Sequence, residues 1–343
     1  MTETLPHRKL SRRRFAAGTA ATFASIALIQ APARAAQWSY KYASNVSIDH
    51  PLNVRMRQCW DAVKRETGGR LEVAVFPNNE LGGDTAALQQ LRAGALQFFT
   101  LDGGILQSVV PVAAIQGIGF AFRDSMQAFR AMDGPLGDYV REAIRAQGLY
   151  VHPKMWDIGM RQITASTGPV RNVGDLAGLK IRTPAGELWL DLFRSLGAAP
   201  GPLNFSEVYT ALQTKVFDGE ENPYEIIDIA RLFEVQKYLS VTNHMWSAYH
   251  LLGNQDAWKA LPPDVQATVD RNLTKYALLQ RHDTQLRNDM LLDKLARRGM
   301  VVNQADTSSL RSKLVSSGFY ARWHERFGPQ AWGLLEKSSG KLT

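Results

Sequence analysis

The chain has 343 residues, of which 45% are hydrophobic, and its 40 Lys and Arg residues against 32 Asp and Glu give a formal net charge of +8. This length is ample for a large core and predicts two domains rather than one. No basic block interleaved with aromatic residues accompanies the positive charge, which argues against a nucleic-acid partner. The only cysteine, Cys59, excludes an intramolecular disulfide.

The first 35 residues have the features of an export signal. Ser11-Arg12-Arg13-Arg14-Phe15 resembles a twin-arginine signal, and the apolar run from Ala16 to Ile29 is shorter than the ~20 residues of a membrane span. The small residues Ala33 and Ala35 predict cleavage before Ala36, after which no stretch is apolar enough to span a bilayer. Subtracting the six Lys and Arg residues and the one Glu of residues 1–35 leaves 34 basic and 31 acidic residues, a net charge of +3.

The first half of the expected mature chain alternates between strand and helix patterns. Strands are predicted at 38–43 and 70–76, each with period-two alternation, and a helix is predicted to begin at Pro51. Cys59 falls on the apolar stripe of that helix, which indicates a buried structural thiol. A further helix is predicted through Leu88 to Ala95. Alternation of this kind is typical of an α/β domain built on a sheet.

A short strand predicted at Leu179 to Ile181 leads directly to Arg182, and Pro184 ends the segment. A helix and a turn rich in acids and amides, at 216–223, follow it. This order of elements presents one fixed guanidinium to a cleft. We therefore predict a receptor for a carboxylate.

The region from Asp264 to Arg298 contains no proline and has irregular helical spacing of apolar residues. An unbroken helix of this length would extend ~50 Å at 1.5 Å per residue, more than one small domain needs. A coiled coil is the alternative, but the apolar repeat is too irregular for heptads. We favour a helix that crosses two domains.

Motifs of the common enzyme classes are missing. The seven histidines form no HExxH pair, no Gly-x-Ser-x-Gly elbow occurs, and Gly117-Ile118-Gly119 lacks the third glycine of a dinucleotide loop. We expect no catalytic residues, no metal site and no cofactor. The alternative that stays open is an exported lyase or hydrolase acting on an acidic substrate, with Asp102 or Glu207 as its base.

Several segments, in order along almost the whole mature chain, resemble the solute-binding proteins of TRAP (tripartite ATP-independent periplasmic) transporters of the DctP type. They lie at 81–94, 119–123, 133–137, 156–162, 178–184, 196–200, 205–213, 216–223, 234–238 and 261–264. The resemblance implies an α/β fold of two lobes that are joined by crossing strands and a long inter-lobe helix and close over a ligand. The expected lobe I comprises 36–158 plus about 247–286, and lobe II comprises 159–246 plus about 287–343.

The resemblance also implies a ligand site. The arginine of the Lys-Ile-Arg motif, Arg182, is expected to hold the ligand carboxylate, with Arg161 of the Gly-x-Arg motif as a second arginine and Asn222 as an amide partner. A guanidinium suits this role because its planar fork matches a carboxylate with two hydrogen bonds.

Four further residues are weaker candidates. Asn45 and Asp102 end strands of the first lobe, where the family places ligand-contacting side chains. Phe205 is expected either to cover an apolar part of the ligand or to pack in the core. Trp156 is expected either to wall the pocket or to fill the hinge. Ile105 is apolar where sialic-acid binders carry a basic residue, which favours a smaller organic acid.

These expectations describe a periplasmic receptor that binds a small carboxylate-containing ligand and delivers it to the TRAP membrane permease. A receptor that signals to a sensor instead would carry the same sequence features. The sequence does not identify the organic acid.

Overall fold

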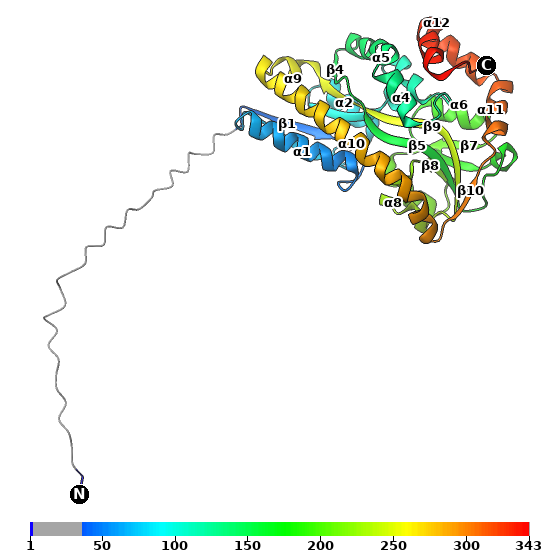
Figure 1. The fold of residues 1–343 in the computed structure, drawn as a ribbon, viewed down its shortest axis with the longest axis horizontal. Helices are drawn as coiled ribbons and strands as arrows, with labels where there is room; N and C mark the ends of the chain where they lie inside the picture. Colours follow the sequence, from blue (N-terminus) through cyan, green and yellow to red (C-terminus); the bar gives the residue numbers. More distant parts are fainter. Residues whose placement is uncertain (3–35, 343) are drawn as a thin grey trace. The chain divides into compact units, whose positions relative to one another are not determined.

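The computed structural model describes residues 1–2 and 36–342. The predicted twin-arginine motif and the apolar run after it lie outside the described residues. From Ala36 onward the chain is an α/β structure with strands at the centre and helices around them (Figure 1).

The strands of the described part form one ten-stranded sheet. Its main path runs β2-β1-β3-β9-β5-β8-β6-β7, and β4 and β10 pair with β9 off this path. The bounds are β1 Trp38–Ala43, β2 Leu71–Phe76, β3 Phe98–Asp102, β4 Leu149–Val151, β5 Trp156–Ala165, β6 Lys180–Thr183, β7 Ala199–Pro202, β8 Gly219–Asn222, β9 Tyr238–Asn254 and β10 Val301–Gln304. The predicted strands at 38–43 and 70–76 are confirmed, the second from Leu71.

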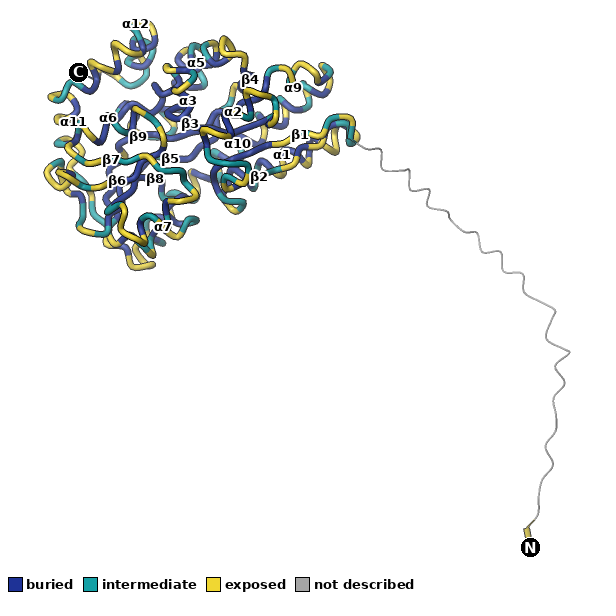
Figure 2. Tube along the Cα trace, turned by 180° about the vertical axis from the view of Figure 1, so that it is seen from behind, coloured by how far each residue is buried: buried dark blue, intermediate teal, exposed yellow. Residues whose placement is uncertain are grey.

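Two long strands connect the halves of the sheet. β9 has 17 residues and β5 has 10, and they run antiparallel to each other through the middle of the molecule (Figure 1). β5 pairs with β9 between Tyr238 and Tyr249, whereas β10 pairs only with the N-terminal part of β9, and β3 and β4 pair only with its C-terminal part. Figure 2 shows these central strands in the buried class, with exposed residues on the surrounding helices and loops.

The α-helices cover the sheet. Their bounds are α1 Pro51–Glu66, α2 Asp84–Arg92, α3 Gly103–Leu106, α4 Ser125–Met132, α5 Pro135–Ala146, α6 Glu187–Ser195, α7 Val208–Gln213, α8 Tyr224–Ile229, α9 Gln255–Lys259, α10 Pro263–Arg297, α11 Thr307–Ser316 and α12 Phe319–Ser339. Short 3₁₀ turns include η1 Pro111–Gly117 and η3 Phe205–Glu207. Cys59 is fully buried in α1, as its place on the apolar stripe predicted. α2 ends at Arg92, before the predicted Ala95, because Gly94 adopts the left-handed conformation (φ 79°) that closes a helix.

The predicted unbroken helix is confirmed: α10 has 35 residues, about 52 Å at 1.5 Å per residue. It packs along α1 and β5 and reaches α8, so it contacts both halves of the sheet (Figure 1). Val265, Val269 and Leu273 are completely buried against the α1 side. Packing of this face, rather than a coiled-coil partner, accounts for the apolar spacing.

The C-terminal segment divides between the two halves. α11 packs against α6, whereas α12 packs mainly against η1, α4 and α5. The expected boundary, with 287–343 in lobe II, stays a prediction. α12 packs through Phe319, Trp323 and Trp332, which belong to the same core cluster as Ala128 and Ala131 of α4.

Candidate functional site

A small cavity lies where strands from both halves of the sheet end. Asp102 ends β3, Asn222 ends β8, and Arg182 lies in β6, which is parallel to β8. The lining residues are Asn45, Val46, Asp84, Asp102, Ile105, Arg161, Arg182, Pro184, Trp189, Phe205, Asn222, Ile226, Ser247 and Tyr249. The cavity volume is about 20 Å³, which is room for roughly one water molecule.

Arg182 is a buried cation that lacks a carboxylate partner. The whole residue is only 2% exposed. Its Nε and Nη2 donate to the carbonyl oxygen of Leu203 at 3.0 and 2.5 Å. Within the described part of the chain, no Asp or Glu forms an ion pair with it. Burial lowers the pKa of Arg182 to about 10, although the carboxylates of Glu221 and Glu220 partly oppose the shift. The guanidinium therefore stays charged at neutral pH and faces the cavity with unused N–H groups.

Arg161, by contrast, is already paired. Its Nε and Nη2 donate to the two carboxylate oxygens of Glu221 at 2.5 and 2.7 Å, and Nη2 also donates to the Glu221 carbonyl at 2.6 Å. Burial disfavours the charge on Arg161, but Glu221 outweighs it and the pKa of Arg161 is raised. His244 Nε2 lies 3.1 Å from Glu221. Arg161 and Glu221 thus form a buried, internally neutralised pair beside the cavity.

Asn222 connects this pair to a second acid. Its Oδ1 accepts from Arg161 Nη2 at 3.2 Å and its Nδ2 donates to Glu220 at 2.5 Å. Glu220 also accepts from the hydroxyl of Thr164 at 2.6 Å. Burial raises the pKa of Glu220 to about 7. Asn222 is therefore fixed in orientation and keeps one amide N–H beyond these bonds.

The wall contributed by the first half of the chain is acidic. Asp102 accepts from Gly104 N at 2.7 Å and from the Ser247 hydroxyl at 2.6 Å, and burial raises the pKa of Asp102 to about 6. Asp84 accepts from the Asn45 amide at 3.0 Å, and the Asn45 oxygen accepts from the Tyr249 hydroxyl at 3.0 Å. The cavity thus has a cationic wall and an acceptor-rich wall.

Six of the seven residues singled out from the sequence line this cavity: Arg182, Arg161, Asn222, Phe205, Asp102 and Asn45. Trp156 does not, because it is completely buried at the start of β5 in the core cluster of α1 and α10. Phe205 both lines the cavity and lies 5.9 Å below the Arg182 guanidinium.

Sequence reasoning missed four polar or aromatic residues of the lining, Asp84, Trp189, Ser247 and Tyr249. Asp84 lies in the family-like segment 81–94, for which the sequence predicts no ligand contact. Tyr249 could have been found only from the register that places it opposite Asp102 in the β3–β9 pair. Trp189 comes from α6, and its ring lies 5.6 Å from the Arg161 guanidinium.

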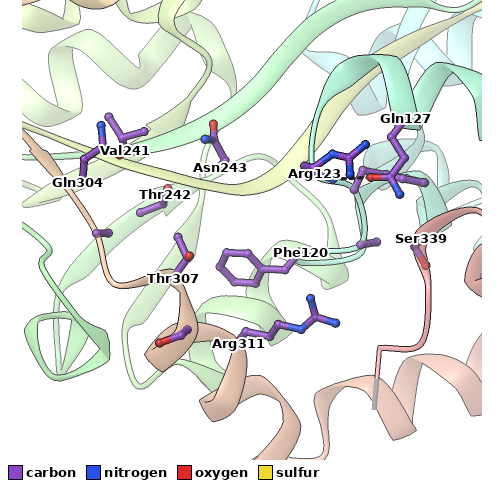
Figure 3. A pocket seen from close by; sticks show the side chains of 14 residues that line it. Phe120, Arg123, Gln127, Val241, Thr242, Asn243, Gln304, Thr307, Arg311 and Ser339 are labelled. Atoms are coloured by element: carbon purple, nitrogen blue, oxygen red, sulfur yellow. Dashed lines mark hydrogen bonds between the residues drawn. The ribbon is translucent and has the colours of Figure 1, made fainter.

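A larger cavity of about 630 Å³ opens beside β9, α11 and the loop before α4 (Figure 3). Its lining includes Arg123 and Arg311, both exposed residues, and Arg123 pairs with the neighbouring Asp124 at 3.1 Å. Water solvates such charges well, so they gain little from an added anion. The buried and unpaired Arg182 makes the small cavity the better anion site despite its size.

Residues 1–2 and 36–342 hold no group of three or more His, Cys, Asp or Glu side chains arranged for a metal ion. None of the helices in that part of the chain combines the length and hydropathy that a bilayer crossing requires.

Comparison with known proteins identifies the family. The sequence profile of the bacterial extracellular solute-binding proteins, family 7 (DctP), matches residues 42–317. The chain belongs to this family. Its members are solute-binding receptors, so the chain is a binding protein of the TRAP DctP type and not an enzyme. The alternative of an exported lyase or hydrolase is therefore wrong.

Individual relatives support this assignment. The 2,3-diketo-L-gulonate-binding periplasmic protein of Escherichia coli is 29% identical over 279 residues, covering 81% of this chain and 84% of its own. An uncharacterized protein of Sinorhizobium fredii is 35% identical over 267 residues, and the match covers 77% of this chain but only 49% of that protein. The chain thus spans about half the length of the second relative.

A solved structure confirms the fold. A TRAP periplasmic solute-binding protein from Polaromonas sp. JS666 bound to D-erythronate superposes with a TM-score of 0.84 at 28% identity, covering 89% of this chain and all of that one. The expected α/β fold with two lobes is therefore confirmed.

Proposed function

We propose that this chain is the periplasmic receptor of a TRAP transporter that captures a small hydroxylated carboxylate on Arg182 and delivers it to the membrane permease. The observation that carries the proposal is the buried guanidinium of Arg182, which lacks a carboxylate partner among the described residues. An unpaired buried charge is costly, and a ligand carboxylate would remove that cost.

The pairing pattern gives the two arginines different roles. Arg182 is the anchor, because its free N–H groups can donate to both oxygens of a carboxylate. The charge of Arg161 is neutralised by Glu221, so Arg161 can donate one or two hydrogen bonds to the ligand but offers it no net positive charge. Asn222 is positioned to donate its remaining amide N–H. Phe205 covers the carbon skeleton beside the anchor.

The acceptor-rich wall favours hydroxyl groups in the rest of the ligand. The carboxyl oxygens of Asp102 and Asp84 accept hydrogen bonds from hydroxyls, and the charge of Asp102 repels a second carboxylate at neutral pH. The E. coli relative is named for 2,3-diketo-L-gulonate and the Polaromonas protein holds D-erythronate, both carboxylates that carry hydroxyls. A hydroxylated monocarboxylate therefore fits this wall better than a dicarboxylate.

Binding is coupled to closure of the two lobes. The lobes are in contact beside the site, where α3 of the first meets α6 of the second. A ligand that touches Arg182 on one lobe and Asp102 on the other binds the closed form more tightly than the open form. It stabilises the closed form by the difference between these two binding free energies. Recognition of the closed form by the permease completes the cycle, and the predicted leader at 1–35 supplies export to the periplasm.

Thermal unfolding of the chain from Ala36 onward tests the proposal. D-erythronate, succinate and the neutral erythritol are the probes. A ligand at about 100 times its Kd adds ~2.7 kcal/mol of stability, which is a readable shift in Tm. We expect stabilisation by D-erythronate, a smaller effect of succinate and none of erythritol. Equal stabilisation by erythritol would contradict a carboxylate receptor.

A further inference from the structure

A second cavity adjoins the Arg182 cavity. It measures about 260 Å³ and shares Phe205 and Ile226 with the smaller one. The rest of its lining is Ser47, His50, Asn78, Ser206, Val208, Tyr209, Ile229, Ala230 and Leu232. We call it the side chamber. Together the two spaces approach the ~300 Å³ at which small-molecule sites begin, whereas the Arg182 cavity alone admits about one water.

His50 lines the side chamber and has a hydrogen-bond donor without a partner in the described part of the chain. His50 is 1% exposed, and its Nδ1 accepts from the backbone N–H of Leu52 at 3.1 Å, which caps α1. The proton of the neutral ring therefore lies on Nε2, which has no hydrogen-bond partner among the described residues. Burial lowers the pKa of His50 to about 3, so the ring stays neutral. The hydroxyl oxygen of Ser47, which also lines the chamber, is buried and has no partner within residues 36–342.

Orphaned polar atoms of this kind call for an explanation, because each costs about 1–3 kcal/mol when it is left without a partner. A neutral N–H donor can bind an uncharged oxygen acceptor, but it supplies no positive charge to offset the cost of burying a second carboxylate. The chamber walls between His50 and Phe205 are mainly apolar, with Val208 and Leu232 almost fully buried. A ligand group entering this space would therefore be an apolar spacer that ends in a hydroxyl, carbonyl or amide oxygen.

We infer that the ligand extends from Arg182 past Phe205 into the side chamber, and that it is a carboxylate whose apolar spacer ends in a neutral oxygen that accepts a hydrogen bond from His50. Phe205 is the partition between the two compartments and, with Ile226, contacts the spacer. The inference rests on the proposed function, since Arg182 anchors the carboxylate. It narrows the ligand class to acids longer than the Arg182 cavity alone would hold.

Calorimetric titration with a homologous series tests this inference. The probes are ω-hydroxycarboxylates of four to eight carbons, each compared with the unsubstituted carboxylate of equal length. Affinity should pass through a maximum with length, and at that length the terminal hydroxyl should improve Kd by about 3- to 10-fold, the range of one net hydrogen bond. A decline with every added carbon would overturn the inference.

Two variants locate the effect. His50→Asn keeps an oxygen that can cap α1 but removes the Nε2 donor, so it should abolish the preference for the hydroxylated acid over the unsubstituted acid of equal length. Ala230→Leu, at the C-cap of α8, should fill the chamber and remove the gain with length. Ala93→Leu, at the C-cap of α2 and exposed, is the matched control and should change neither.

These titrations distinguish a failure of the side-chamber inference from a failure of the proposed receptor function. Binding of short acids with no gain from length or hydroxyl, in wild type and His50→Asn alike, would overturn the side chamber and leave the receptor intact. An absence of binding by every carboxylate in the series and by D-erythronate would overturn both.

Discussion

The guanidinium of Arg161 and the carboxylate of Glu221 lie face to face with Nε–Oε2 and Nη2–Oε1 distances of 2.5 and 2.7 Å, and both side chains are at most 4% exposed. Burial alone would raise the pKa of Glu221, but Arg161 and His244 together outweigh it and hold that pKa below its usual range. The pair neutralises one arginine of the site and leaves Arg182 as the unpaired one. This difference between two arginines is the basis of the ligand assignment.

Removing one partner of this pair should be costly. Glu221→Gln leaves Arg161 buried without its counter-ion, and we expect a loss of about 3–5 kcal/mol in the free energy of unfolding, measured with urea. The double variant Arg161→Gln, Glu221→Gln should recover part of that loss, because no uncompensated charge remains. A loss below 1 kcal/mol in Glu221→Gln would contradict the buried pairing.

Stability should fall as the pH rises from about 4.5 to about 7. Burial raises the pKa of Glu220 to about 7, so the folded protein keeps a proton there that the unfolded chain has already lost near pH ~4.3. In that window the folded state binds more protons, and the free energy of unfolding decreases with pH. Glu220→Gln should flatten this dependence in urea midpoints measured from pH 4.5 to 8. Parallel curves for wild type and variant would contradict the assignment.

Contact between the lobes at Gly104 should be sensitive to a single methyl group. A Cβ on Gly104 would lie 2.3 Å from the ring of Trp189, a residue of α6 that is 1% exposed. Gly104→Ala should therefore oppose closure and weaken ligand binding by about tenfold, within the range of ~1–3 kcal/mol for overpacking. The Tm without ligand should change little. The control is Gly333→Ala, where a Cβ meets no atom within 4 Å; a lower Tm with unchanged Kd in Gly104→Ala would contradict a role in closure.

The acidic wall should set the choice between hydroxylated acids and dicarboxylates. Asp102→Asn removes a charge that repels a second carboxylate, so the preference for D-erythronate over succinate should shrink by about tenfold. Calorimetric Kd values for both acids check this. Asp306→Asn, at an exposed N-cap outside the site, is the control. An unchanged preference in Asp102→Asn would show that the wall does not select.

The sequence predicted those parts of the fold that local patterns encode. The alternation at 38–43 and 70–76 and the proline-free run after Asp264 gave β1, β2 and α10, because each follows from side-chain periodicity. The packing of α12 did not follow from pattern. Whether α12 packs on α4 and α5 or on the second lobe depends on which apolar surface the rest of the fold leaves uncovered.

The sequence anticipated much of the cavity lining but not its internal contacts, and the ligand-binding roles of these residues stay predictions. Arg182, Arg161 and Asn222 were found through motifs, and all three line the cavity. The pairing of Arg161 with Glu221 was missed, because a sequence shows two charged residue types but not the 2.5 Å contact between them. His50 was missed for the same reason, since its function depends on the nitrogen that the helix cap leaves free.

The most direct test of the account is the Kd of an organic acid for Arg182→Ala. Truncating one partner of a buried charge pair costs ~2–5 kcal/mol, so D-erythronate should bind at least ~30-fold more weakly. Arg182→Lys should also lose affinity, because an ammonium lacks the planar fork. Arg123→Ala, at the exposed arginine of the larger cavity, should bind like the wild type. Near wild-type affinity in Arg182→Ala, or a large loss in Arg123→Ala instead, would contradict the account.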